Sequence, residues 1–178
     1  MVYGGGVRKP TQVILFCAIL FNTEQVENSE KVVEENFGEI FLTSKKFSFS
    51  HTNYYKPEMG ESLIKYFAGI NKFIYPDEIV DLKLKAVEIE NKFLIDNKRM
   101  INIDPGYVAL EKVVAASTKN FSHRIYLGNS IYGDLQLIRK KGSYEKLPWT
   151  FYDYNTILSL DFFEKLRNKL KEHLDEQK

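Results

Sequence analysis

The stretch QVILFCAILF (12–21) is the strongest constraint on what this chain can fold into. It is apolar at every position after the first, so both faces of any element formed here need cover. It is too short to span a bilayer and has no signal-peptide layout before it. A central strand covered on two sides satisfies these conditions. Cys17 is the only cysteine, so we expect a buried thiol, no internal disulfide and a reducing, cytoplasmic compartment.

Composition is compatible with one packed domain. The chain has 178 residues, of which 44% are apolar and 14% aromatic, so it can bury a substantial core. We expect a flexible lead-in over 1–10 and a single α/β domain over 11–178. The net charge of +1 argues against a protein built mainly to hold nucleic acid or a membrane surface. The glycines of MVYGGGVRKP precede no Lys-Ser/Thr, so they form no phosphate loop.

Hydrophobic periodicity predicts the order strand, helix, strand, strand, helix, strand. This is the order of a ferredoxin-like βαββαβ core, and it places the chain in the α/β (α+β) class. The predicted strands are 12–21, 39–49, 63–74 and 99–103, and the predicted helices lie over about 24–37 and 76–97.

The rest of the chain extends this core. We interpret 107–118 as a short helix, although its pattern is ambiguous. Residues 124–147 are predicted to be a β-hairpin region that turns at Gly128-Asn129 and Lys141-Gly142. A C-terminal helix from about Ser159 has a narrow apolar seam that we expect to dock on the outside of the domain; the seam consists of Phe162, Leu166, Leu170 and Leu174.

This topology predicts where a site would form. We take the second and fourth strands of the core to run antiparallel to the first and third. The loops that leave them, 50–60 and 104–107, would then meet at one edge of the sheet.

The first of these loops carries an unusual set of side chains. His51, Tyr54, Tyr55 and Glu58 are crowded into it, and rigid scaffolds often hold their chemistry on loops. An Asp104 carboxylate that orients an imidazole would complete half of a general-base pair. The alternative is local: the tyrosines pack over the sheet edge, and His51 and Asp104 bond to nearby backbone.

A second stretch, FSHRIYL (121–127), repeats the Phe-Ser-His setting of FSHTNYY (49–55). Its Arg124 follows His123, in a chain with few arginines. A guanidinium grips phosphate or carboxylate at two points, so Arg124 is a candidate for binding an anion. The alternative is a structural ion pair with an acid such as Asp134 or Asp153.

Aromatic side chains would wall the cleft. Tyr107 and Tyr126 lie beside the candidate residues, and Trp149 belongs to LPWTFYDYN (147–155). An aromatic group near a basic residue could stack on a nucleobase, whereas a hydrophobic plug over the end of the sheet is the commoner use.

Two kinds of chemistry could use His51 and His123. His51, Glu58, Asp104 and His123 form a donor set that could hold zinc, iron or manganese, but no tight spacing such as His-x-x-x-His supports a metal. A two-histidine phosphoesterase needs Ser or Thr two residues after each histidine, where this chain has Asn53 and Ile125. We therefore assign no metal and leave any cofactor unknown.

The chain contains three longer distinctive stretches: FSFSHTNYYKPEMG, INIDPGYVALEKVVAASTKNFSHRIYLGNSIYGDL and LPWTFYDY. Together they resemble the bacterial domain-of-unknown-function family DUF4416, over about Thr11 to His173. Asn53 stands where that family often has aspartate, which removes one carboxylate from the site. The resemblance implies no activity, because the family has none assigned; some members carry a GTP-binding label, for which this chain offers no phosphate loop.

The sequence thus predicts a cleft that binds, and could act on, a phosphorylated small molecule or nucleotide. Arg124 would grip the anion, His51 and His123 would serve as acid and base, and Asp104 or Glu58 would orient one of them. The alternative is a non-catalytic interaction module for a protein or RNA, in which the same residues form a structural polar network. The oligomeric state is left open.

Overall fold

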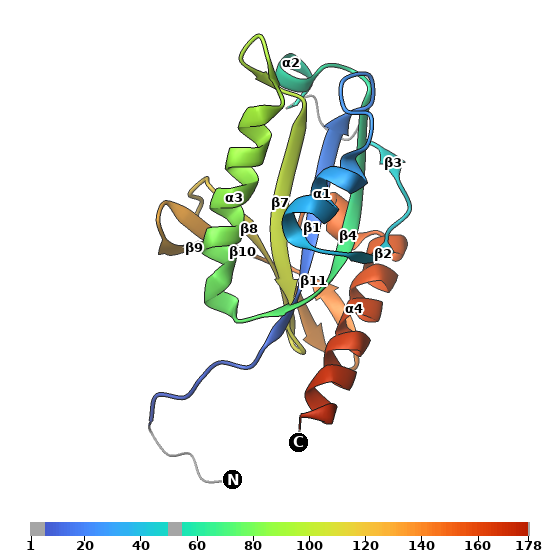
Figure 1. Cartoon of the computed structure of the whole chain (residues 1–178). Coiled ribbons are helices and arrows are strands. Elements are labelled where there is room, and N and C mark those ends of the chain that lie inside the picture. Colours follow the sequence, from blue (N-terminus) through green and yellow to red (C-terminus); the bar gives the residue numbers. More distant parts are fainter. Residues whose placement is uncertain (1–5, 50–54, 178) are drawn as a thin grey trace.

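The computed structural model describes residues 6–49 and 55–177, which form a mixed α+β fold (Figure 1). In chain order the elements are β1 (Val13–Asn22), α1 (Ser29–Phe37), β2 (Ile40–Thr43), β3 (Phe47–Ser48), α2 (Lys56–Met59), β4 (Leu63–Ile74), the 3-10 helix η1 (Pro76–Glu78), α3 (Ile79–Lys92), β5 (Leu94–Ile95), β6 (Lys98–Arg99), β7 (Ile101–Val108), β8 (Lys112–Ser117), β9 (Arg124–Gly128), β10 (Ile131–Lys140), β11 (Ser143–Lys146), the 3-10 helix η2 (Tyr152–Asn155) and α4 (Ile157–Glu176). The large antiparallel sheet has the order β11-β10-β8-β7-β1-β4-β2, with β3 also paired to β4 and β9 to β10. β5 and β6 form a separate hairpin.

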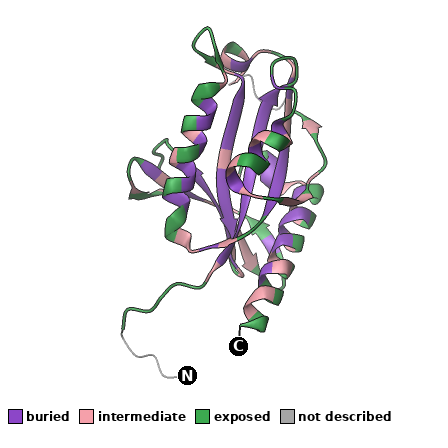
Figure 2. Ribbon diagram, in the orientation of Figure 1, coloured by how far each residue is buried: buried purple, intermediate pink, exposed green. Residues whose placement is uncertain are grey.

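β1 lies in the interior of the sheet, as its apolar sequence predicts. All ten of its residues are buried (Figure 2), and it pairs antiparallel with β4 on one side and β7 on the other. Leu15 and Cys17 belong to the core beneath α1 and α3, whereas Ile14 and Phe16 belong to the core beneath α4. The prediction of a buried structural thiol is confirmed, and burial raises the pKa of Cys17 well above its ordinary value.

α4 forms a full layer on the second face of the sheet (Figure 1). It begins at Ile157, where the Thr156 hydroxyl accepts a hydrogen bond from the Ser159 N–H. The predicted seam is buried as far as Leu170, and Phe163 widens it. Within residues 6–49 and 55–177, no helix combines the length and apolarity needed to cross a membrane.

The predicted turns of the C-terminal hairpin region are confirmed. Gly128 and Asn129 have positive φ angles of 119° and 48°, and Lys141 and Gly142 have 48° and 90°. These conformations suit Gly and Asn, and they match the twist of tight hairpins.

The second predicted helix ends earlier than expected. It stops at Lys92, and residues 94–99 turn back as the β5–β6 hairpin. Asp96 and Asn97 make that turn with φ angles of 50° and 59°, which Asp and Asn tolerate better than most side chains. An Asp-Asn pair directly after an apolar Leu-Ile was the signal for this hairpin.

The prediction of a short helix over 107–118 is wrong. The segment is the end of β7, a turn, and β8. Its residues are buried on both faces of the sheet, so the alternation that marks a half-buried strand is missing. Asp104-Pro105-Gly106 also continues the strand instead of ending it. Gly106 allows β7 to approach its neighbours closely, since a Cβ there would lie 2.4 Å from the Phe16 ring.

The predicted meeting of two loops rests on the wrong strand directions. β1 and β2 both run antiparallel to β4, and β7 runs antiparallel to β1. The last residues of β2 and of β7 therefore lie at opposite ends of the strands. The first residues of β7 lie at the end where β1 finishes, and there Asp104 is linked to Glu58 through Arg99 and Asn102.

Candidate functional site

The sheet divides between β7 and β8. The two strands pair only from Gly106 to Val108, so within the described chain residues 101–105 have no strand beside them on that side. A cavity of about 860 Å³ lies in the division, with Asn102 and Asp104 on one wall and residues 115–119 on the other. Side chains from α3, β4, β6, β9 and β10, from the segment 151–154, and from Phe49 and Tyr55 complete the lining.

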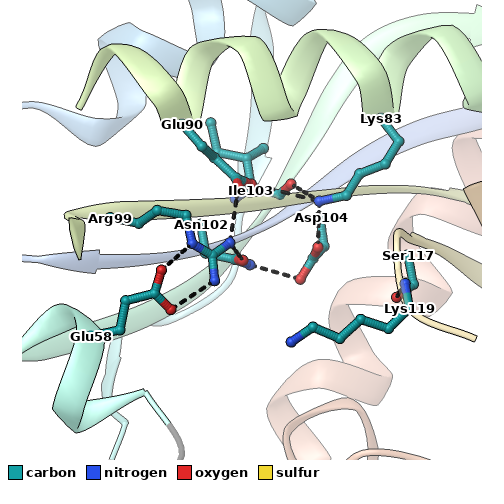
Figure 3. Close-up of polar contacts among 9 residues, drawn as sticks. All are labelled: Glu58, Lys83, Glu90, Arg99, Asn102, Ile103, Asp104, Ser117 and Lys119. Carbon is teal, nitrogen blue, oxygen red and sulfur yellow. Dashed lines mark hydrogen bonds and ion pairs between the residues drawn. The ribbon is translucent and has the colours of Figure 1, made fainter. Parts of the chain in front are cut away.

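Side chains of α3 take the place of a strand along the open edge of β7. The Ile103 N–H donates to Glu90 Oε1 at 2.8 Å, and Lys83 Nζ donates to the Ile103 C=O at 2.8 Å (Figure 3). Lys83 and Glu90 lie two helical turns apart, so both project from the same side of α3. Buried backbone groups need partners, and these two buried side chains supply them.

Asp104 extends this network into the cavity. Its Oδ1 accepts from Lys83 Nζ at 2.8 Å, and its Oδ2 accepts from Asn102 Nδ2 at 2.8 Å. Burial raises the pKa of Asp104, but the Lys83 ammonium outweighs it, so the pKa lies below its ordinary value. Burial lowers the pKa of Lys83, but Asp104 and Glu90 outweigh it and the pKa is raised. Both groups are therefore charged at neutral pH.

Arg99 connects this wall to α2. Its Nε and Nη2 donate to the two carboxylate oxygens of Glu58 at 2.6 and 2.9 Å. Its Nη1 donates to Glu90 at 3.0 Å and to Asn102 at 2.9 Å (Figure 3). The hydrogen bonds to Arg99 lower the pKa of Glu58, and those to Glu58 raise the pKa of Arg99. A continuous series of ion pairs thus connects Glu58 to Lys83 through Arg99 and Glu90.

The opposite wall is organised by Asp134 on β10, whose side chain is 1% exposed. Arg124 Nε donates to its Oδ2 at 2.7 Å, and Gln136 Nε2 donates to its Oδ1 at 2.7 Å. Arg124 Nη1 also donates to the Ser117 hydroxyl and to the Lys119 C=O, at 3.1 and 2.9 Å. Arg124 therefore forms the structural ion pair that was the alternative for this residue, while its side chain also lines the cavity.

The described lining carries five cationic side chains and four carboxylates, which leaves one positive charge. The cations are Lys65, Lys83, Arg99, Lys119 and Arg124, and the carboxylates are Glu90, Asp104, Asp134 and Asp153. Lys65 pairs with Asp153 at 2.5 Å and lies 5.3 Å from the centre of the Phe49 ring. Glu58 bonds to Arg99 from outside the lining, and including its carboxylate brings the net charge around the cavity close to zero.

Four of the residues predicted from the sequence lie at this cavity. Tyr55, Asp104 and Arg124 line it, and Glu58 holds Arg99 at its side. His51 and Tyr54 lie outside the described residues.

Four other predicted residues lie away from the lining. Tyr107 is buried in the core beneath α3, on the other face of β7. His123 stacks on Trp149 with 5.1 Å between ring centres, and its Nε2 lies 3.3 Å from Asp134 Oδ1 without hydrogen-bond geometry. Tyr126 is 59% exposed on β9.

Sequence reasoning missed the charged residues of the β7 wall. Lys83 and Glu90 fall at helical spacing with the buried Ile79 and Ala86, so they lie on the apolar face of α3. Charges on such a face are rarely buried unless they are paired. This signal was present in the sequence, although it does not identify the partner strand.

No group of three or more His, Cys, Asp or Glu side chains within residues 6–49 and 55–177 is arranged to hold a metal ion. The four-residue donor set considered from the sequence includes His51, which lies outside these ranges.

Comparison with protein families identifies a match over most of the chain. The family described as "Domain of unknown function (DUF4416)" matches residues 11–170, most of the chain. No curated protein and no solved structure shows significant similarity. The match includes both walls of the cavity and confirms the resemblance found in the sequence motifs. The chain belongs to the DUF4416 family.

Proposed function

We propose that the protein binds a small phosphorylated molecule or a nucleotide in the cavity between β7 and β8. The observation that carries this proposal is the convergence of five cationic side chains, each from a different segment, on one cavity. Its volume, about 860 Å³, falls in the range of about 300–1,000 Å³ that is typical of small-molecule sites.

The balance of charge limits the ligand. Five cations against four lining carboxylates leave little excess positive charge for a polyanion. A phosphate monoester adds one to two negative charges and fits this balance better than a triphosphate does. Arg124 and Lys119 lie on the wall opposite the β7 network, and they are the groups that we assign to the anion.

Aromatic side chains support a ligand that also carries a ring. Tyr55, Phe151 and Tyr152 line the same cavity as the cations. Phe151 and Tyr152 are 43% and 66% exposed, and the Arg124 guanidinium lies 5.9 Å from the centre of the Phe151 ring. Stacking on such rings tolerates any base, so a nucleoside monophosphate is a suitable ligand class.

The electrostatics favour binding over proton transfer at the described carboxylates. The pKa values of Asp104 and Glu58 are both lowered by cationic partners, so at neutral pH these groups stay ionised and bonded. A general base works best with a pKa near the working pH. Turnover would therefore need another acid or base; His123 lies away from the lining, so we propose turnover only as an extension of ligand binding.

A second candidate function is a non-catalytic interaction module. The observation that favours it is the mutual bonding of the polar residues, since Glu58, Arg99, Asn102 and Asp104 form one continuous network. In this alternative the network only supports a surface for a protein or RNA partner.

We also propose that the β7-β1-β4-β2 part of the sheet, with α1 and α3, is a ferredoxin-like unit. Its strands, numbered by their order in the chain, lie in the order fourth, first, third, second, and every neighbouring pair is antiparallel. This order supports the assignment.

A thermal-shift screen tests the binding function. The panel contains inorganic phosphate, nucleoside monophosphates and triphosphates, sugar phosphates and uncharged nucleosides. A ligand at a hundred times its dissociation constant should add about 2.7 kcal/mol to the free energy of unfolding. We expect the largest shift from a monophosphate.

The matched variants are Lys119→Met and Lys171→Met, both at exposed positions. Lys119→Met removes one cavity charge and keeps the backbone contacts of residue 119, so it should weaken the shift; Lys171→Met, on α4, should not. A panel in which no compound raises the melting temperature would contradict ligand binding and favour the interaction module.

A further inference from the structure

β9 (Arg124–Gly128) is an edge strand with one open side. It pairs with β10 from Ile131 to Asp134, and within the described chain no strand lies on its other side (Figure 1). An open edge presents unpaired N–H and C=O groups that can pair with another strand.

The side chains of this edge are apolar on both faces. Ile125, Tyr126 and Leu127 are consecutive, and they are 70%, 59% and 42% exposed. Phe121, just before the strand, is 64% exposed. A run of exposed apolar residues on an edge strand is a liability for a protein that stays monomeric.

The other edges of the sheet are protected by charge. β11 carries Glu145 and Lys146 as exposed residues, and the exposed Lys45 and Lys46 follow β2. The only charge of β9 is Arg124, whose side chain is 11% exposed and is paired with Asp134. β9 is therefore the edge without the usual protection.

We propose that β9 pairs antiparallel with β9 of a second copy of this chain and joins the two sheets across a two-fold axis. A register centred on Tyr126 places Ile125 of one copy opposite Leu127 of the other, so apolar side chains meet. The same register places Arg124 opposite Gly128, which has no side chain to clash with it. The one charged side chain of β9, Arg124, is paired with Asp134, so β9 of a second copy meets no repulsion between like charges.

The area indicates a reversible dimer. With about 200 Å² for each large side chain, the exposed fractions of these four residues give roughly 450 Å² per copy. The backbone adds to this, so the total approaches the lower limit of about 1,000 Å² for a specific interface. The dimer should therefore dissociate on dilution. It does not depend on ligand binding in the cavity.

Sedimentation velocity over a wide dilution series tests the proposal with the full-length protein. Wild type should be a dimer at high concentration and a monomer at low concentration. Ile125→Lys places a charge on the open edge of β9, so it should be monomeric throughout. Ile95→Lys is the matched control: Ile95 is 44% exposed on the separate β5–β6 hairpin, and this variant should dimerise like wild type.

Hydrogen exchange on the wild type provides a second measurement that needs no variant. Amides within 124–128 should exchange more slowly at the concentration where the dimer forms. A wild type that stays monomeric at every concentration, a dimer that persists in Ile125→Lys, or unchanged exchange in β9 would each overturn the proposal.

Discussion

The two halves of β7 are held in different ways. From Gly106 to Val108 the strand pairs with β8, and its backbone groups are satisfied by a regular ladder. At Ile103 no strand of the described residues lies on that side, and Lys83 and Glu90 supply the hydrogen bonds instead. Where the sheet opens to form a cavity, buried charges replace a strand.

This difference separates two groups of charges in the cavity. Lys83, Glu90 and Arg99 are engaged in holding the open half of β7. Lys119 and Arg124 reach the cavity from the opposite wall. We expect the first group to control mainly stability and the second to control mainly ligand affinity.

The largest expected effect comes from removing Lys83, which bonds to the half of β7 that does not pair with β8. Lys83→Met removes the ammonium that bonds to the Asp104 carboxylate and to the Ile103 C=O, and it leaves Glu90 with Arg99 as its remaining cationic partner. It should therefore lower the free energy of unfolding by about 3–5 kcal/mol. Urea denaturation measures this loss. Lys85→Met, at an exposed position on the same helix, is the matched control and should cost far less. Equal losses in the two variants would contradict the structural role of Lys83.

The paired half should be sensitive to a change in volume. A Cβ at residue 106 would lie 2.4 Å from the Phe16 ring and 2.6 Å from the Val114 carbonyl oxygen. Gly106→Ala should therefore destabilise the protein by about 1–3 kcal/mol through overpacking. Gly6→Ala, where a Cβ meets nothing within 4 Å, should leave the urea midpoint unchanged. An unperturbed midpoint in Gly106→Ala would show that the strands are less closely packed there.

A smaller effect concerns pH. The pKa of Asp104 is lower in the folded protein than its ordinary value of 3.8, so the folded state favours the ionised form. This contribution is present above about pH 4 and is lost as the pH falls through the folded pKa. The free energy of unfolding of wild type should therefore decrease below pH 4, and the decrease should be shallower in Asp104→Asn. If the free energy of unfolding fell equally with pH in wild type and in Asp104→Asn, the ion pair with Lys83 would not stabilise the ionised form of Asp104.

The sequence predicts the fold better than it predicts the site. The apolar run of β1, the period of α4 and the turn residues of the β10–β11 hairpin act locally, so each could be recognised without its neighbours. Residues 107–118 could not, because burial on both faces removes the alternation that distinguishes a strand.

The candidate site depends on contacts between distant segments. Asp104 and Arg124 stand out by residue type, and both line the cavity. Asp134 was one of the partners considered for Arg124, and the structure confirms that pair. Lys83, the partner of Asp104, comes from α3 and was not predicted, and nothing in the sequence states where β7 and β8 part. Tyr107 illustrates the opposite error: it follows Asp104 by three residues, and the alternation of the strand turns it to the other face.

The most direct test of the binding site is an NMR titration of backbone amides with inorganic phosphate and with adenosine monophosphate. We predict saturable shifts at residues 102–104 and 117–119, weaker in Lys119→Met and unchanged in Tyr107→Phe, whose altered side chain faces the other core. Shifts that are scattered over surface lysines, or that are equally strong in Lys119→Met, would contradict a binding site between β7 and β8.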